Sequence, residues 1–113
     1  MHEMSLMESV LEIVEEEARK AGARRVKAVR LDIGELSHVE PEAMRFCFEA
    51  VVAGTIAAQA VLEIVRVPGE GWCLDCAKTV PLSERFGACP ECGGHMVQMT
   101  AGDDMRVAEL EVE

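Results

Sequence analysis

The chain has 113 residues, half of them hydrophobic, and a net charge of −10 at pH 7. This composition excludes a disordered tail, and a field of that sign disfavours nucleic acid and anionic membranes as partners. No apolar run approaches the ~18 residues of a membrane helix, and residues 1–21 lack the basic start of a signal peptide, so we expect a cytoplasmic protein.

The first predicted element is an amphipathic helix at the N-terminus. From Met4 to Ala21, apolar residues recur at spacings of three and four, as on one face of a helix. Ser5 and Glu8 match a capping box, and Gly22 supplies a stop. The pattern therefore predicts a helix that begins at the capping box and packs its apolar face on a core.

The remaining elements alternate between strands and one more helix. The patterns predict a strand at 26–33, a helix at 41–53, a strand at 60–67 and a strand at 105–112. Met96 to Met99 is predicted as a short partner of the last strand, with Ala101–Asp104 as the turn. We expect an α+β fold with a small three-stranded sheet and two helices.

Residues 68–95 differ from the rest of the chain. They hold four of the five cysteines, three of the four prolines and five of the nine glycines. This stretch has too few apolar residues for a core of its own. We therefore expect it to be an inserted zinc-ribbon-like segment, a domain separate from residues 1–67 and from the strand region 96–113 that completes them.

The cysteines of this segment form two knuckles, Cys73–Cys76 and Cys89–Cys92, separated by twelve residues. Two residues between cysteines let both thiolates face one metal ion, and two such knuckles supply the four ligands of a closed structural Zn²⁺ site. Because every position is filled, none remains for a catalytic water. A rubredoxin-like iron site for electron transfer and a zinc-ribbon adaptor without a second metal are the alternatives. The fifth cysteine, Cys47, is predicted to be a buried small hydrophobe.

The opening Met1-His2-Glu3 offers a different set of ligands. A bulky His2 protects the initiator methionine from removal, so we expect Met1 to carry the free α-amine. That amine, the backbone nitrogen of His2 and its imidazole close fused five- and six-membered chelate rings, and the amide or carboxylate of Glu3 completes them. A nitrogen-rich tetragonal site suits Ni²⁺ or Cu²⁺. A disordered terminus is the alternative.

Three other residues have side chains that could bind a metal ion. His38 and His95 are predicted to be ordinary loop residues. Glu40 is expected near the first turn of the first helix, where it would supply an outer ligand.

Taken together, these features resemble the HypA/HybF hydrogenase nickel-incorporation proteins. The resemblance is carried by the opening Met-His-Glu-Met-Ser-Leu, the strand and loop 29–43, the Phe46-Cys47-Phe48 helix, the Gly54-Thr55 turn and the paired knuckles, in that order along nearly the full chain. It implies a small metallochaperone for [NiFe]-hydrogenase maturation and not an enzyme. It also implies an α/β nickel domain completed by the C-terminal strand, with the zinc segment inserted.

The resemblance further implies the ligands and the partners. It implies that transient Ni²⁺ is bound by Met1, His2 and Glu3. It also implies that structural Zn²⁺ is bound by the four knuckle cysteines, Cys73, Cys76, Cys89 and Cys92. The implied partners are a HypB-type GTPase and the precursor of the hydrogenase large subunit, with a homodimer left open. Because the chain has no GxxxxGKS phosphate-binding run, nucleotide hydrolysis must come from the partner.

Overall fold

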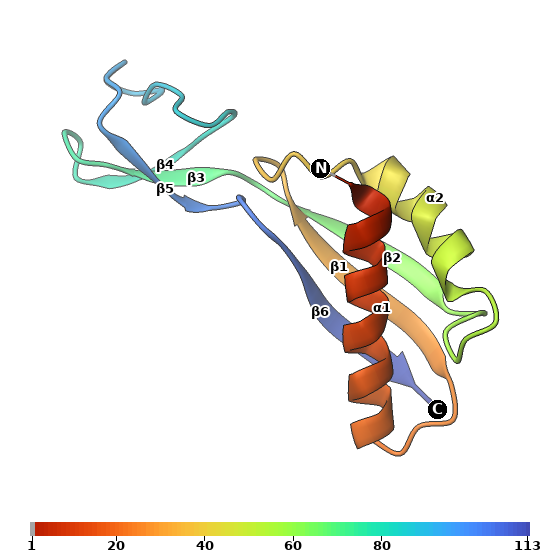
Figure 1. Ribbon diagram of the computed structural model, residues 1–113. Helices are drawn as coiled ribbons and strands as arrows, with labels where there is room; N and C mark the ends of the chain where they lie inside the picture. Colours follow the sequence, from red (N-terminus) through yellow and green to blue (C-terminus); the bar gives the residue numbers. More distant parts are fainter. Residues whose placement is uncertain (1) are drawn as a thin grey trace. The chain divides into compact units, whose positions relative to one another are not determined.

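The computed structural model describes residues 2–113. Within them lie two helices and six strands, in the order α1 (Glu3–Lys20), β1 (Val26–Gly34), α2 (Pro41–Val52), β2 (Val61–Val67), β3 (Glu70–Cys73), β4 (Lys78–Pro81), β5 (Val97–Ala101) and β6 (Met105–Val112). The strands form two three-stranded sheets (Figure 1). The expected α+β class is confirmed. Neither helix in the described range is long and apolar enough to cross a membrane.

Helix α1 has the predicted apolar face but starts earlier than the sequence pattern suggested. Its buried residues are Met7, Val10, Val14 and Ala18. The Leu6 amide donates to the His2 carbonyl at 3.1 Å, so the first turn closes over His2 and Ser5 lies inside the helix. The predicted Ser5–Glu8 capping box is therefore wrong. The acidic Glu3, at the first helical position, suits the positive end of the helix dipole.

The first sheet has the order β2-β1-β6, with β1 in the centre. Val29, Leu31 and Ile33 of β1 are fully buried, and α1 and α2 both cover this face (Figure 1). Helix α2 contributes the buried Met44, Cys47, Phe48 and Val52. Cys47 is thus a core residue, as its position on the apolar face of a helix predicted.

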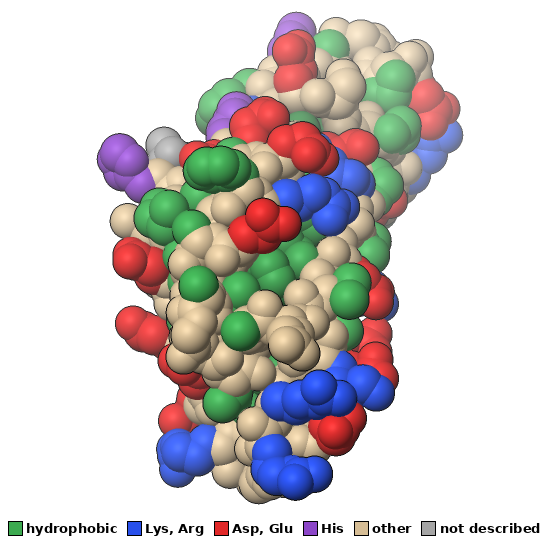
Figure 2. Space-filling view, turned by 90° about the vertical axis from the view of Figure 1, so that its right-hand side faces the viewer, with side chains coloured by type: hydrophobic (Ala, Val, Ile, Leu, Met, Phe, Trp, Pro, Cys, Tyr) green, Lys and Arg blue, Asp and Glu red, His purple; other side chains and the backbone are tan. Residues whose placement is uncertain are grey.

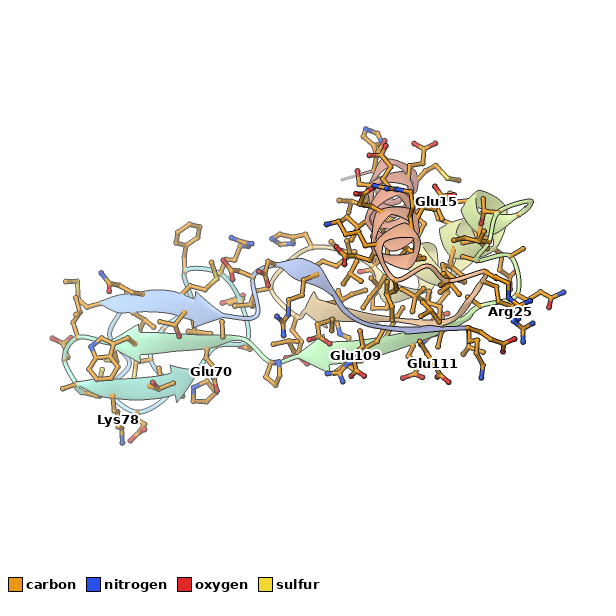
Figure 3. The ribbon with its side chains drawn as sticks, turned by 90° about the horizontal axis from the view of Figure 1, so that it is seen from below. Glu15, Arg25, Glu70, Lys78, Glu109 and Glu111 are labelled. Atoms are coloured by element: carbon orange, nitrogen blue, oxygen red, sulfur yellow. The ribbon has the colours of Figure 1, made fainter. Side chains whose placement is uncertain are left out.

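The opposite face of this sheet carries charged cross-strand pairs. Glu109 and Glu111 of β6 point away from the helices (Figure 3), and they pair with Arg30 and Lys27 of β1 at 3.0 and 3.5 Å. Figure 2, which views the molecule from another side, also shows acidic and basic side chains next to one another on the surface. The cross-strand ion pairs are the evidence for the open face of the sheet. This face is therefore solvated and contributes no second core.

The second sheet has the order β4-β3-β5 and is antiparallel throughout. Strand β5 pairs with β3, so the prediction that Met96 to Met99 would partner the C-terminal strand is wrong. The reason is the packing of Val97, which lies against the small core formed by Cys73, Val80 and Cys89. The alternating apolar side chains of β5 therefore face the small core of the second sheet.

The contacts divide the chain into two compact units. The first comprises Met1–Asp32, Val39–Val65 and Arg106–Glu113, and the second Ile33–His38 and Arg66–Met105. Both helices belong to the first unit and all four knuckle cysteines to the second. Residues 96–105, which we expected to belong with the nickel domain, lie in the second unit.

Glycines allow backbones to meet closely within the second unit. A Cβ on Gly34 would lie 2.1 Å from the carbonyl oxygen of Gly102, and one on Gly102 would lie 2.6 Å from that of Pro68. Gly102 also has a φ of +86°, which side chains rarely adopt. Only glycine fits where these three segments meet.

Candidate metal centres

The first cysteine knuckle is built on the end of β3. Cys73 is the last residue of that strand and is fully buried. The chain then turns back, with the Ala77 amide donating to the Cys73 carbonyl at 2.8 Å. Inside this turn the Cys76 amide points at the Cys73 sulfur, at 3.4 Å. The strand therefore fixes one sulfur and the turn brings the second beside it.

The second knuckle is a turn without a flanking strand. The Gly93 amide donates to the Cys89 carbonyl, and the Cys89 amide to the Gly94 carbonyl, both at 2.8 Å. Gly93 has a φ of +74°, a backbone conformation that glycine adopts without steric cost. The Glu91 amide points at the Cys89 sulfur at 3.4 Å. As in the first knuckle, a backbone N–H is aimed at a sulfur and would stabilise a thiolate there.

The two knuckles bring all four sulfurs together. The ligand atoms of Cys73, Cys76, Cys89 and Cys92 lie within 4.8 Å of one another. The Cys73–Cys92 and Cys76–Cys89 sulfurs are 3.8 and 3.9 Å apart. Tetrahedral Zn–S bonds of about 2.3 Å require sulfur separations of about 3.8 Å. The cysteines are free of disulfides, and the cluster fits a structural zinc site.

The cluster also shows why a cation belongs there. Hydrogen bonding to the Cys73 sulfur, more than burial, raises the pKa of the Cys76 thiol to about 12. The backbone N–H of Cys92 lowers the pKa of Cys89 to about 7. Four sulfurs so close cannot all ionise without a positive charge among them.

An ion pair that was not predicted from the sequence joins the two knuckles. The Lys78 ammonium lies 2.6 Å from the Glu91 carboxylate, and each side chain is about half exposed. Lys78, labelled in Figure 3, is two residues beyond Cys76, and Glu91 lies between the cysteines of the second knuckle. The Glu91 carboxylate raises the pKa of Lys78 and keeps it charged. In the sequence, the signal for this ion pair is a basic residue just after the first knuckle and an acidic residue inside the second.

Two of the three predicted nickel ligands, His2 and Glu3, lie at the start of α1. Met1 lies outside the described residues. His2 is exposed, has an extended backbone (φ −101°, ψ 100°) and is the N-cap of the helix. The Glu3 carboxylate accepts a hydrogen bond from the Glu40 amide at 3.4 Å. Glu40 thus lies at the first turn of α1, as predicted from the sequence.

The other two histidines are not members of the four-cysteine cluster. Both His38 and His95 are exposed, and His38 has a φ of +63°. Among residues 2–113, the four cysteines are the one group of three or more metal-binding side chains that converge. A chelate made from an α-amine and backbone nitrogens would not be such a group.

Comparisons with known proteins agree with this architecture. A family model described as hydrogenase/urease nickel incorporation, metallochaperone, hypA, matches residues 1–112. The hydrogenase maturation factor HypA of Rhizobium leguminosarum bv. viciae is 68% identical over 112 residues, covering 99% of each chain. That of Rhodopseudomonas palustris (strain BisA53) is 63% identical over 113 residues, covering 100% of each.

A solved structure shares the fold. The solution structure of the Ni metallochaperone HypA from Helicobacter pylori superposes with a TM-score of 0.73 at 31% identity, covering 99% of this chain and 97% of that one. These relatives are named for metal carriage and maturation, and not for a catalysed reaction. With a family match over its whole length, two helices on a three-stranded sheet and a four-cysteine cluster, the chain belongs to the HypA family of hydrogenase nickel-incorporation metallochaperones.

Proposed function

We propose that this chain collects Ni²⁺ at its N-terminus and delivers it during maturation of a [NiFe]-hydrogenase. The observation that carries the proposal is the end-to-end match to nickel-incorporation proteins by a chain that opens with Met-His-Glu. The chain itself catalyses no reaction. It works in the cytoplasm, a reducing compartment that suits its free thiols.

The start of α1 supports a chelate that uses backbone nitrogens. The first amides of a helix have no acceptor in a preceding turn, so the nitrogens of His2 and Glu3 lie outside the helical hydrogen bonds. The imidazole of His2 is exposed beside them. With the α-amine of Met1, these nitrogens form the fused rings of a tetragonal site, which favours Ni²⁺.

The position of Glu3 narrows the choice of its ligand atom. Its carboxylate already accepts the Glu40 amide. Its backbone nitrogen lies next to that of His2 in the chain and has no helical acceptor to give up. Rotation about ψ of His2, which is 100° in the free helix start, brings both nitrogens to the same ion. We therefore favour the Glu3 amide as the fourth donor. Glu40 then acts from outside the chelate, as an outer ligand or as the group that holds Glu3.

The four cysteines are the proposed site of Zn²⁺. When bound, the ion supplies the charge that lets the thiolates coexist and cross-links the two knuckles. The apolar core of the second sheet is small and includes two of the cysteines. The ion is thus a structural part of this unit. An iron-loaded electron-transfer protein would instead be red and show a reversible one-electron wave.

The two proposed sites suit a carrier that works with partners. An exposed chelate on a chain end can exchange its ion, and the acidic surface raises the local cation concentration. Nickel passes to the precursor of the hydrogenase large subunit. A HypB-type GTPase supplies the nucleotide hydrolysis, for which this sequence has no phosphate-binding loop.

Nickel titration of the untagged, zinc-loaded protein tests the proposal. Calorimetry should show one Ni²⁺ per chain, and His2→Ala should abolish that binding while the zinc content stays unchanged. His95→Ala, which removes an exposed histidine elsewhere, is the matched control. Equal nickel affinity in His2→Ala and the unaltered chain would refute the N-terminal site, and no nickel binding at all would favour a zinc-ribbon adaptor.

A further inference from the structure

The turn Glu84–Gly87 in the second unit displays a phenylalanine. Phe86 is 94% exposed, the most exposed of the large hydrophobic side chains in the described chain. It also has a φ of +60°. The Gly87 amide donates to the Glu84 carbonyl at 3.2 Å, which makes Phe86 the third residue of a four-residue turn. With positive φ, that position favours Gly or Asn.

Neither local folding nor packing explains a phenylalanine there. A bulky residue with positive φ is a backbone outlier, and this ring recovers little by burial. A glycine follows directly at Gly87, so the glycine that would suit the turn stands one position too late. Strain of this kind is typical of positions that are kept for function.

The side chain of Arg85 holds the turn in place through two hydrogen bonds. The Arg85 Nε donates to the Leu36 carbonyl at 2.7 Å, and its Nη2 donates to the Asp103 carbonyl at 3.3 Å. Both acceptors belong to the same unit as the turn. The side chain before Phe86 is therefore fixed, and the ring is presented from an ordered base. Presentation of this kind lowers the entropy lost when a partner binds.

Exposed acidic side chains lie near the turn that displays the ring. Glu84 belongs to the turn, and the exposed Asp103 and Asp104 lie in the segment that Arg85 contacts. The one cation of the turn, Arg85, is engaged with two carbonyl groups, so the exposed charges offered near Phe86 by Glu84, Asp103 and Asp104 are negative. A complementary surface has an apolar pocket rimmed by Lys or Arg.

We propose that Phe86 is the anchor by which the second unit docks onto a maturation partner protein that presents an apolar pocket with a basic rim. The choice of partners rests on the proposed function, but the docking site does not. Buried aromatic anchors carry much of the binding energy in interfaces of this kind.

Two substitutions separate docking from folding. Phe86→Gly relieves the backbone and removes the ring, and Phe86→Asn removes the ring while tolerating the positive φ. The control is Phe46→Ala, because Phe46 is 75% exposed on the unstrained helix α2. Calorimetry then measures the affinity for two purified probes, the hydrogenase large-subunit precursor and the HypB-type GTPase of the same organism.

We expect both Phe86 variants to weaken binding to at least one probe by about tenfold or more. Phe86→Gly should also raise the melting temperature, which a packing role would not do. Phe46→Ala should change the affinity by no more than about twofold. Arg85→Gln should weaken binding to the same probe, because the ring is then presented from a less ordered turn.

Unchanged affinity of both Phe86 variants for both probes would overturn the proposal, as would an unaltered chain that binds neither. A lower melting temperature in Phe86→Gly would assign the ring to packing. Dimerisation that depends on Phe86 in ultracentrifugation would make a second copy the occupant instead. Nickel titration of the same proteins keeps the two proposals apart, because nickel binding that survives a docking failure leaves the proposed function standing.

Discussion

The second unit and the start of α1 present their candidate ligands in opposite ways. In the second unit, two turns and a strand bring four sulfurs within 4.8 Å, and two of these cysteines are buried. At the start of α1, His2 is exposed, and the neighbouring nitrogens belong to the helix terminus itself. A closed set of ligands retains its ion, whereas a chelate on a chain end releases it readily. If both proposed sites hold, the fold separates a resident ion from a cargo ion.

The prediction with the largest expected effect concerns the loss of the zinc ion. Cys73→Ser or Cys92→Ser should release zinc and disorder residues 68–95, because zinc contributes roughly 10–16 kcal/mol to such sites and the local apolar core is small. The first unit has its own core around Met7, Leu31 and Met44 and should remain folded. Circular dichroism and zinc analysis measure both effects. Unfolding of the whole protein on zinc loss would show that the units are not independent.

The second test blocks the chain end without touching a side chain. Adding Gly-Ser before Met1 converts the α-amine into an amide, which is far harder to deprotonate. Nickel binding should weaken about as severely as in His2→Ala, with zinc content and circular dichroism unchanged. A C-terminal tag is the matched control and should have no effect. Calorimetry that gives equal nickel affinity in both tagged proteins would place the site elsewhere, most simply on His38 or His95.

The third test concerns the backbone of the second unit. Gly102→Ala places a Cβ 2.6 Å from the Pro68 carbonyl oxygen at a φ of +86°, and should destabilise the protein by about 3 kcal/mol. Gly54 also has positive φ, +77°, but a Cβ there meets nothing within 4 Å. Gly54→Ala should cost only about 1 kcal/mol. Urea denaturation measures the difference, and equal losses would mean that the close approach has little effect.

The sequence predicted the elements of the first unit well, because its periodic patterns extend over whole helices and strands. Its errors arose where local signals were ambiguous. Ser5 and Glu8 fit a capping box, but nothing at residues 3 and 4 stops the helix from starting earlier. Strand β5 alternates equally well for either sheet, and only the packing of Val97 decides its partner.

The candidate site was predicted unevenly for a related reason. Cysteine spacing predicts a cluster, because two residues between cysteines let a tight turn bring both sulfurs to the same side of that turn. The contact between Glu3 and the Glu40 amide depends on how the two helices pack, which spacing does not reveal. The pairing of Lys78 with Glu91 likewise needs both knuckles to be in place, and it supplies the last and smallest test of the contrast.

Lys78 places a positive charge beside the cysteine cluster and links the two knuckles through Glu91. Lys78→Met should therefore speed zinc loss to a chelator, by about two- to fivefold because the pair is half exposed and screened by solvent. Lys27→Met breaks a similar exposed pair, with Glu111 in the first unit, and should leave zinc loss unchanged.

The charge-swapped chain Lys78→Glu/Glu91→Lys separates the charge of Lys78 from its link to Glu91. It should restore the slow zinc loss only in part if the positive charge must stand at position 78, and fully if the link alone matters. Chelator kinetics at low and high salt separate these outcomes, since added salt weakens the charge effect and brings the Lys78→Met and unaltered chains together. Identical zinc loss in those two chains at low salt would show that the sulfurs and backbone N–H groups hold the ion without help from this pair.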